Sequence, residues 1–325
     1  MRELSADAQT LLAVLDTDPS RPRVVAIGGG HGLAQVLRSA VGYAGTLSAI
    51  VTVADDGGSS GRLAPALNIP PPGDIRKCLI AMSPDETVWR RLFEYRFNAS
   101  DVGGHSLGNL LLASLADIEG DFEAALRAAE RLLGAAGEVI PVCRGRLQLT
   151  AAKGEQTISG QAEITRTHGP FDSIEVTPGA VANPRALSAI AGADQIVLGP
   201  GSLFTSTIAT LVVPGIADAV NDSKASLIYV ANLYTQAGET LGMDAADHLS
   251  VLIRVGGIRS PNAIVAHNAL VEVPLPQQPL QVEVEILETF GVHVVLADIV
   301  DPKTVWPQHD AVKLCNALGE LVTYL

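Results

Sequence analysis

The segment Val24-Val25-Ala26-Ile27-Gly28-Gly29-Gly30-His31-Gly32-Leu33 joins a short apolar strand to a glycine-rich turn. A second segment, Ala49-Ile50-Val51-Thr52-Val53-Ala54-Asp55-Asp56-Gly57-Gly58-Ser59-Ser60-Gly61-Arg62-Leu63, repeats this arrangement. Where a strand ends in glycines and opens a helix, the backbone can approach a phosphate, and the free amides of the helix start donate to it. The two segments therefore predict an α/β protein that binds a nucleotide.

Strands and helices alternate along the rest of the chain, which predicts a Rossmann-like, doubly wound and mainly parallel sheet. Between Val139 and Pro178 the pattern changes to short strands separated by glycine turns, and Gln161–Ile164 is among the strands expected there. This predicts a small antiparallel β excursion at about residues 139–178. Residues 23–325 are expected to form a single domain, and residues 1–22, with a short helix at Ala6–Leu15, an N-terminal extension.

Composition narrows the class of protein. The net charge is −13, which disfavours nucleic acid and anionic membranes as partners. The three cysteines are far apart and form no CxxC pair, so we expect reduced core thiols in a cytoplasmic protein rather than a zinc site or disulfides. No secretory signal is visible, and no apolar run reaches the roughly 20 residues that a membrane helix needs.

The first loop departs from the dinucleotide fingerprint. Gly28 and Gly30 fit G-x-G-x-x-G, but the next glycine is Gly32, one position early. A strand-to-helix turn without a ligand is the alternative interpretation.

The second loop carries two adjacent acids. Asp55 or Asp56 could hold ribose hydroxyls, or Asp55 with Asp74 could hold Mg²⁺ against a diphosphate. Arg62 could neutralise phosphate charge as a fork. The alternative is a solvated acidic turn.

Further motifs point to the same edge of the sheet. Gly199-Pro200-Gly201-Ser202 is a third glycine turn between a strand and a helix. Asn183-Pro184-Arg185 could add a cation, or simply be an N-cap followed by proline at the first helical position. The loop Asn232–Thr240 could contact a base or sugar, or act as a capping loop.

A serine hydrolase is another hypothesis, because Gly104-His105-Ser106-Leu107-Gly108 satisfies G-x-S-x-G. The residues before this motif are polar, whereas a nucleophile elbow needs an apolar strand. Ser106 is therefore expected to cap a helix over Leu107–Ala116.

Six motifs in order, GGGHGL, VTVADDGGSSGRL, PPPGDIRKCL, GGHSLGNLLL, ADQIVLGPGSLFTS and NLYTQAGET, resemble those of the gluconeogenesis factor family. That family is related to the 2-phospho-L-lactate transferase of coenzyme F420 biosynthesis. The resemblance implies a Rossmann-like homodimer that binds a nucleotide sugar such as UDP-N-acetylglucosamine and regulates central carbon metabolism and cell shape. It attaches no firm enzymatic activity to the regulatory branch.

The transferase branch moves a phospholactyl group from a guanosine diphosphate donor to a deazaflavin alcohol, with Mg²⁺ held by aspartates. Asp55 and Asp74 occupy the matching positions, so they are the expected metal ligands if Mg²⁺ is bound with a nucleotide diphosphate. The full DDGGSSGRL motif favours the regulatory branch. The expected ligand-binding residues are Gly29, Gly30, His31, Gly32, Asp56, Ser59, Ser60, Arg62, Asn183, Arg185, Gly199, Gly201, Ser202 and Asn232.

Three positions depart from the usual pattern of this family. His31 stands in place of a threonine, and Tyr234 in place of a methionine. Trp306-Pro307-Gln308-His309 lacks an arginine that many members place before the histidine. If that arginine helps to hold the nucleotide sugar in other members, the ligand or its affinity is expected to differ in this chain.

Overall fold

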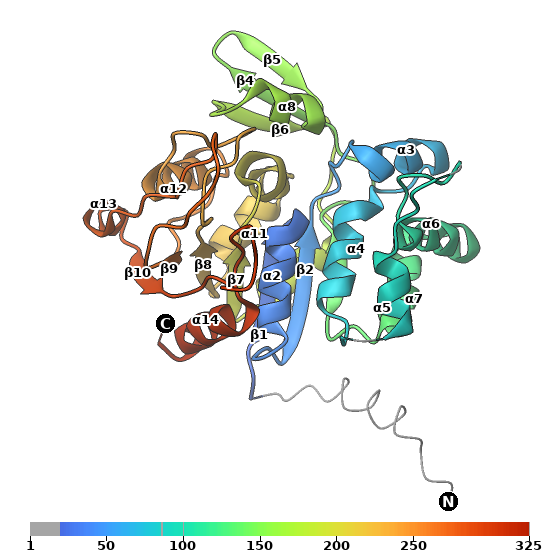
Figure 1. Cartoon of the computed structure of the whole chain (residues 1–325), viewed down its shortest axis with the longest axis horizontal. Coiled ribbons are helices and arrows are strands. Elements are labelled where there is room, and N and C mark those ends of the chain that lie inside the picture. Colours follow the sequence, from blue (N-terminus) through green and yellow to red (C-terminus); the bar gives the residue numbers. More distant parts are fainter. Residues whose placement is uncertain (1–19, 86, 100, 325) are drawn as a thin grey trace, which may run out of the picture.

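The computed structural model describes residues 20–85, 87–99 and 101–324. Seven strands form one parallel sheet in the order β10-β9-β8-β7-β1-β2-β3 (Figure 1). Their bounds are β1 Arg23–Gly28, β2 Thr46–Val51, β3 Glu138–Pro141, β7 Gln195–Leu198, β8 Ser226–Val230, β9 Ala263–His267 and β10 His293–Ala297. The doubly wound α/β fold predicted from the sequence is confirmed.

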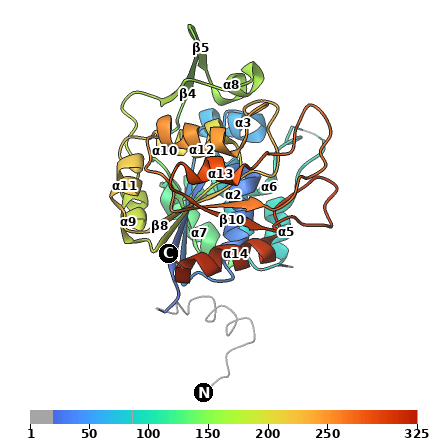
Figure 2. The same cartoon turned by 90° about the vertical axis from the view of Figure 1, so that its left-hand side faces the viewer.

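Helices cover both faces of this sheet. Their bounds are α2 Gly30–Ala40, α3 Gly58–Leu67, α4 Pro72–Ala81, α5 Val88–Glu94, α6 Leu107–Glu119, α7 Phe122–Leu133, α8 Gln161–Thr167, α9 Pro184–Gly192, α10 Ala209–Leu211, α11 Ile216–Asp222, α12 Ala245–Arg254, α13 Val284–Glu288 and α14 Ala311–Tyr324. A π-helical segment, η1, spans Leu203–Ile208, where the sequence predicts an α-helix. Figure 2 shows the sheet edge-on between these helices.

The central strands are buried on both faces, as expected for parallel strands between two helical layers. Val24, Val25, Ala26 and Ile27 of β1 are at most 2% exposed, and most of the residues paired with them on β2 and β7 are apolar, the exceptions being Ser48 and Gln195. This burial fixes β1 at the centre of the sheet.

A second, antiparallel sheet of order β5-β4-β6 stands above the carboxyl ends of the main strands (Figure 1). It consists of β4 Leu149–Lys153, β5 Gln156–Ser159 and β6 Ser173–Val176. The predicted excursion is therefore present, although β3, at Glu138–Pro141, belongs to the main sheet. The expectation of a strand at Gln161–Ile164 is wrong, because this segment begins α8.

The winding direction changes between β1 and β7. The chain passes from β1 through α2 to β2 on one side, and from β7 through η1 and α11 to β8 on the other. In open α/β sheets the crevice at such a switch point is where ligands bind. The glycine turns after β1 and β7 meet at this crevice.

No single helix in the described part of the chain is long and apolar enough to span a membrane. One consecutive pair, Leu203–Leu211 and Ile216–Asp222, meets that test only jointly and is bent by 73°. The predicted helix at Ala6–Leu15 lies outside the described residues.

Candidate functional site

A cavity of about 560 Å³ lies at the switch point, where the turns after β1, β2, β7 and β8 converge. Its lining combines glycine backbone, charged groups and an aromatic wall: Gly29, Gly30, His31, Gly32, Gln35, Asp55, Asp74, Lys77, Gln161, Pro200, Gly201, Ser202, Ser206, Asn232, Leu233, Tyr234, Gln236, Trp306, Pro307, Gln308 and His309. The structure thus brings nine of the sequence-predicted residues together: Gly29, Gly30, His31, Gly32, Asp55, Asp74, Gly201, Ser202 and Asn232.

The start of α2 points backbone amides toward the cavity. Its N-cap is Gly29 in extended conformation, and no described side chain caps this end. The first turn carries no acidic residue. A helix start with unpaired amides and a positive dipole end is suited to an anion such as phosphate.

Two glycines are required here by close approach. A Cβ on Gly32 would overlap the carbonyl oxygen of Pro200, so the turns after β1 and β7 pack backbone to backbone. A Cβ on Gly29 would lie 2.7 Å from Oδ2 of Asp74 and 2.8 Å from Cγ2 of Thr52. These glycines allow the loop to meet both the neighbouring turn and a carboxylate.

The third glycine turn already has internal partners for several of its amides. The carboxylate of Glu239, a buried residue of the loop after β8, accepts hydrogen bonds from the amides of Phe204 (2.8 Å) and Thr205 (3.4 Å). Asn232 pairs with Gly201 in both directions, at 2.8 and 2.9 Å. Glu239 thus occupies the start of η1, whereas the start of α2 has no such partner and stays open to the cavity.

Asp55 and Asp74 form the acidic part of the cavity. Asp74 lies in the first turn of α4 and pairs with Lys77, whose Nζ is 2.9 Å from Oδ1. Burial, and then the charge of Asp74, raise the pKa of Asp55 above its usual value. Two carboxylates that repel each other in a half-buried cavity are a plausible donor set for Mg²⁺, which takes one or two carboxylates together with substrate oxygens.

The described residues contain no group of three or more His, Cys, Asp or Glu side chains arranged to hold a metal. Asp55 and Asp74 would therefore need ligand oxygens to complete the coordination of a cation. This fits Mg²⁺ carried in with a diphosphate better than an ion held by the protein alone.

Asp56 does not line the cavity and instead contacts the first turn of α8, next to the small sheet. Its Oδ1 accepts a hydrogen bond from the amide of Ala162 at 2.9 Å, in the first turn of α8. Gly160, with φ of +96°, lets the chain pass Asp56, because a Cβ there would lie 3.0 Å from Oδ2. The two adjacent acids thus have separate places: Asp55 lines the cavity, and Asp56 caps α8.

The other predicted residues of the second loop lie outside the cavity lining. Ser59 is buried, with its Oγ 2.9 Å from Nδ1 of His105 and 3.0 Å from Nδ2 of Asn109. Ser60 accepts from the amide of Gly73 at 3.0 Å. Arg62 is exposed and donates to the carbonyl of Gly103 at 3.1 Å. These contacts attach the loop to α4 and to the segment before α6.

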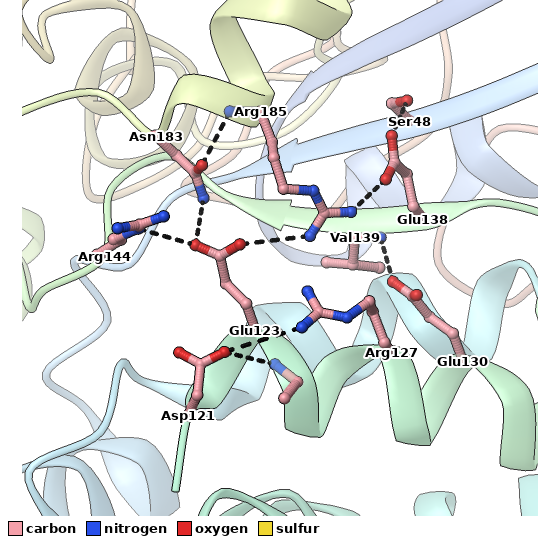
Figure 3. Close-up of polar contacts among 11 residues, drawn as sticks. Ser48, Asp121, Glu123, Arg127, Glu130, Glu138, Val139, Arg144, Asn183 and Arg185 are labelled. Carbon is pink, nitrogen blue, oxygen red and sulfur yellow. Dashed lines mark hydrogen bonds and ion pairs between the residues drawn. The ribbon is translucent and has the colours of Figure 1, made fainter. Parts of the chain in front are cut away.

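Asn183 and Arg185 also lie outside the cavity lining, as does Gly199. Asn183 caps α9 by accepting from the amide of Arg185 at 3.0 Å, as the capping interpretation of Asn183-Pro184-Arg185 predicts. The guanidinium of Arg185 contacts Glu123 of α7 and Glu138 of β3 in an ion-pair cluster (Figure 3). Asn183 and Arg185 therefore attach α9 to α7 and β3.

Ser106 is the N-cap of α6, as predicted, and its Oγ accepts from the amide of Asn109 at 3.3 Å. It is fully buried, and the neighbouring imidazole of His105 is directed to Ser59 instead. The geometry therefore gives no support to the serine hydrolase hypothesis.

Sequence reasoning found the aromatic and amide wall of the cavity only in part. Tyr234 and Gln236 belong to the loop Asn232–Thr240, for which contact with a base or sugar was one interpretation. Trp306, Gln308 and His309 were noted only as part of a segment that departs from a family pattern. Lys77 had a local signal, since it lies three residues after Asp74 on the same helix. The remaining residues are brought to the cavity by long-range contacts, which no local pattern reveals.

Fold and cavity together define a doubly wound α/β protein with a cavity lined by glycine turns at its switch point. The family model of the 2-phospho-L-lactate transferase CofD matches residues 24–300, and the chain belongs to this family. It is 37% identical to a gluconeogenesis factor of Halalkalibacterium halodurans, covering 92% of this chain and 96% of that protein. It is 36% identical to the gluconeogenesis factor of Bacillus subtilis, with coverage of 93% and 98%.

A solved structure supports the same placement. The crystal structure of protein BH3568 from Bacillus halodurans superposes with a TM-score of 0.87 at 36% identity, and covers 92% of this chain and 99% of that chain. The fold described above is therefore the fold of this relative.

Proposed function

We propose that the chain binds a nucleotide sugar of the UDP-N-acetylglucosamine type and, as a cytoplasmic homodimer, regulates central carbon metabolism and cell shape. The observation that carries the proposal is the uncapped start of α2, which opens into a cavity shared with Lys77. Backbone amides and an ammonium group suit a diphosphate. Family membership, together with the relatives named gluconeogenesis factor, supports the regulatory role.

Thermal unfolding with and without UDP-N-acetylglucosamine tests the binding step. A ligand selective for the native state at 100 times its Kd stabilises by about 2.7 kcal/mol, so Tm rises with concentration. If no UDP- or GDP-linked ligand shifts Tm at millimolar concentration, the proposal fails.

The variant His31→Glu gives a sharper test of where the phosphates bind. It places a carboxylate in the first turn of α2, which is favourable for the helix but repels an anion. Because the charge of nearby Asp74 opposes the favourable effect of the helix dipole, we expect Tm without ligand to change little, while affinity for UDP-N-acetylglucosamine falls more than about 10-fold. Ser114→Glu adds the same charge on the exposed side of α6 and should leave affinity unaltered.

Mg²⁺-dependent transfer from a nucleotide diphosphate donor is the second candidate function, because Asp55 and Asp74 share one cavity. A cation bound between these carboxylates and the donor would polarise a phosphoryl oxygen. Asp55 and Asp74 would hold the ion, while the α2 amides orient the diphosphate. Loss of turnover in Asp55→Asn would support transfer, and absence of turnover by the wild type with deazaflavin acceptors would exclude it.

The homodimer is tested separately by sedimentation. A species of twice the 33.8 kDa chain mass at micromolar concentration is expected. A single species of 33.8 kDa would contradict the proposed dimer and leave the proposed ligand site untouched.

A further inference from the structure

An aromatic pair lines the same cavity as the α2 amides. The rings of Tyr234, in the loop after β8, and Trp306 meet edge to face, with centroids 5.8 Å apart and planes at 85°. Nε1 of Trp306 donates to the hydroxyl of Tyr234 at 2.5 Å. This contact fixes each ring against the other, and an edge-to-face pair leaves ring faces uncovered.

The segment that carries Trp306 is anchored to the sheet. His309 is buried, and its Nε2 donates to the carbonyl of Ala231 at 3.1 Å, directly after β8. The amide of Asp301 donates to the carbonyl of Gln308 at 2.9 Å, which closes the loop at its base. Burial lowers the pKa of His309 to about 4, so this anchor stays neutral at physiological pH. The aromatic wall is therefore held in place before a ligand arrives.

The cavity lining combines two kinds of surface. The α2 amides, Lys77 and the two aspartates are polar or charged, whereas Leu233, Tyr234 and Trp306 offer apolar and aromatic surface. Trp306 lines the cavity and is still 38% exposed, which leaves a large ring partly in water. Among the described residues, Oε1 of Gln236 is buried without a hydrogen-bond partner, and Gln236 also lines the cavity. A planar group with N–H donors would satisfy both features.

We propose that Tyr234 and Trp306 form the platform on which the base of a bound nucleotide stacks. This inference rests on the proposed function, since it assigns the base-binding part of the same site. The phosphates would lie at α2 and the base at the aromatic wall. Stacking on an aromatic side chain tolerates different bases, so the wall would contribute affinity more than base selection.

Intrinsic fluorescence tests the contact directly, because the chain has two tryptophans. Trp89 lies on α5, outside the cavity lining, so Trp89→Phe leaves Trp306 as the single reporter. We expect UDP-N-acetylglucosamine and UMP to change Trp306 emission with saturation, while N-acetylglucosamine 1-phosphate, which has no base, does not. If UDP-N-acetylglucosamine raises Tm and leaves Trp306 emission unchanged, the stacking inference is wrong and the proposed function stands.

Substitution of the ring gives an independent measurement. Trp306→Leu is expected to weaken UDP-N-acetylglucosamine binding on the order of 10- to 100-fold, and Trp306→Phe to restore most of it. Tm without ligand and affinity for N-acetylglucosamine 1-phosphate should change little in either variant. Equal affinity of wild type and Trp306→Leu for the nucleotide sugar would overturn the inference. A wild type that binds no nucleotide at millimolar concentration overturns both this inference and the proposed function.

Discussion

Glu239 shows how a single buried side chain determines which glycine turn is open to a ligand. Its carboxylate is 2% exposed and accepts from two amides at the start of η1 and from the hydroxyl of Thr205. A carboxylate there plays the part that a bound anion would play at a free helix start. The turn after β7 therefore lines the cavity while the amides that follow it are already paired. The turn after β1 has backbone N–H groups that are free to donate to a ligand.

The variant Glu239→Gln should be less stable than wild type by about 1–3 kcal/mol. Both backbone amides donate to Oε2, so the variant keeps an acceptor for them only by turning its NH2 group to the hydroxyl of Thr205, and its neutral oxygen accepts more weakly than a carboxylate. Urea denaturation measures the difference. Glu288→Gln, at an exposed position, is the control and should be neutral; equal stability of the two variants would contradict the role given to Glu239.

Gly32 and Gly30 lie in the same turn but should respond differently to alanine. Gly32→Ala forces a methyl group onto the carbonyl oxygen of Pro200 and should cost more than about 2 kcal/mol, because backbone must move. Gly30 has φ of +68° and no atom within 4 Å of an added Cβ. Gly30→Ala should therefore cost only the strain of the left-handed conformation, about 1–2 kcal/mol. Thermal unfolding of both variants measures the two losses of stability. A larger loss in Gly30→Ala than in Gly32→Ala would contradict this prediction.

At the scale of the secondary-structure elements, α8 depends on a residue far away in sequence for its N-terminal cap. Its first turn is capped by Asp56, and its last turn leads to His168, whose ring contacts the carbonyl of Ala237. A Cβ on Gly238 would lie 2.5 Å from Cγ2 of Thr165, so α8 also packs closely on the loop after β8. This helix is wedged between two loops that border the cavity.

Asp56→Ala should loosen α8 without unfolding the main sheet. Loss of a capping carboxylate costs about 1 kcal/mol, and that cost falls on the small sheet and its helix. We expect trypsin to cleave after Arg166 several-fold faster, with Tm lowered by only a few degrees. Asp117→Ala, an exposed change on α6, should leave the cleavage rate at the wild-type value; unaltered cleavage in Asp56→Ala would contradict the capping role.

The alternation of apolar strands and helices was sufficient to predict the doubly wound sheet, because burial between two helical layers marks parallel strands in sequence. Gln161–Ile164 was assigned to a strand wrongly because its helical state depends on a cap from Asp56, over a hundred residues away in sequence. Similarly, Gly199–Ser202 looks like an open phosphate turn until Glu239 folds onto it. Local patterns predict helices and strands well. Which side chain binds the free amides at a helix start is decided by tertiary contacts, which local patterns do not reveal.

The stability of the folded chain should depend on pH through Glu130. Its Oε1 accepts from the amide of Val139 at 2.7 Å, and burial, with the charge of Glu138 adding to it, raises its pKa to about 7 (Figure 3). Between about pH 4.5 and pH 7, the Glu130 carboxyl keeps its proton in the folded chain but has lost it in the unfolded chain. Its contribution to the free energy of unfolding therefore falls as pH rises from about 4.5 to 7, by at most about 1.4 kcal/mol per pH unit.

Urea denaturation at pH 5 and pH 8 measures this dependence. Glu130→Gln keeps an acceptor for Val139 but does not titrate, so it should be more stable than wild type at pH 8 relative to pH 5. If wild type and variant have the same pH profile, the proton is not held at Glu130.

The contact between Gly32 and Pro200 has a consequence for how a ligand enters. It joins the two halves of the sheet, backbone to backbone, at the point where the winding direction reverses. The halves cannot hinge apart there without breaking that contact, so entry takes place without opening of the sheet. Association should then follow a single kinetic phase, with an observed rate that rises linearly with ligand concentration, as for encounter with a rigid receptor.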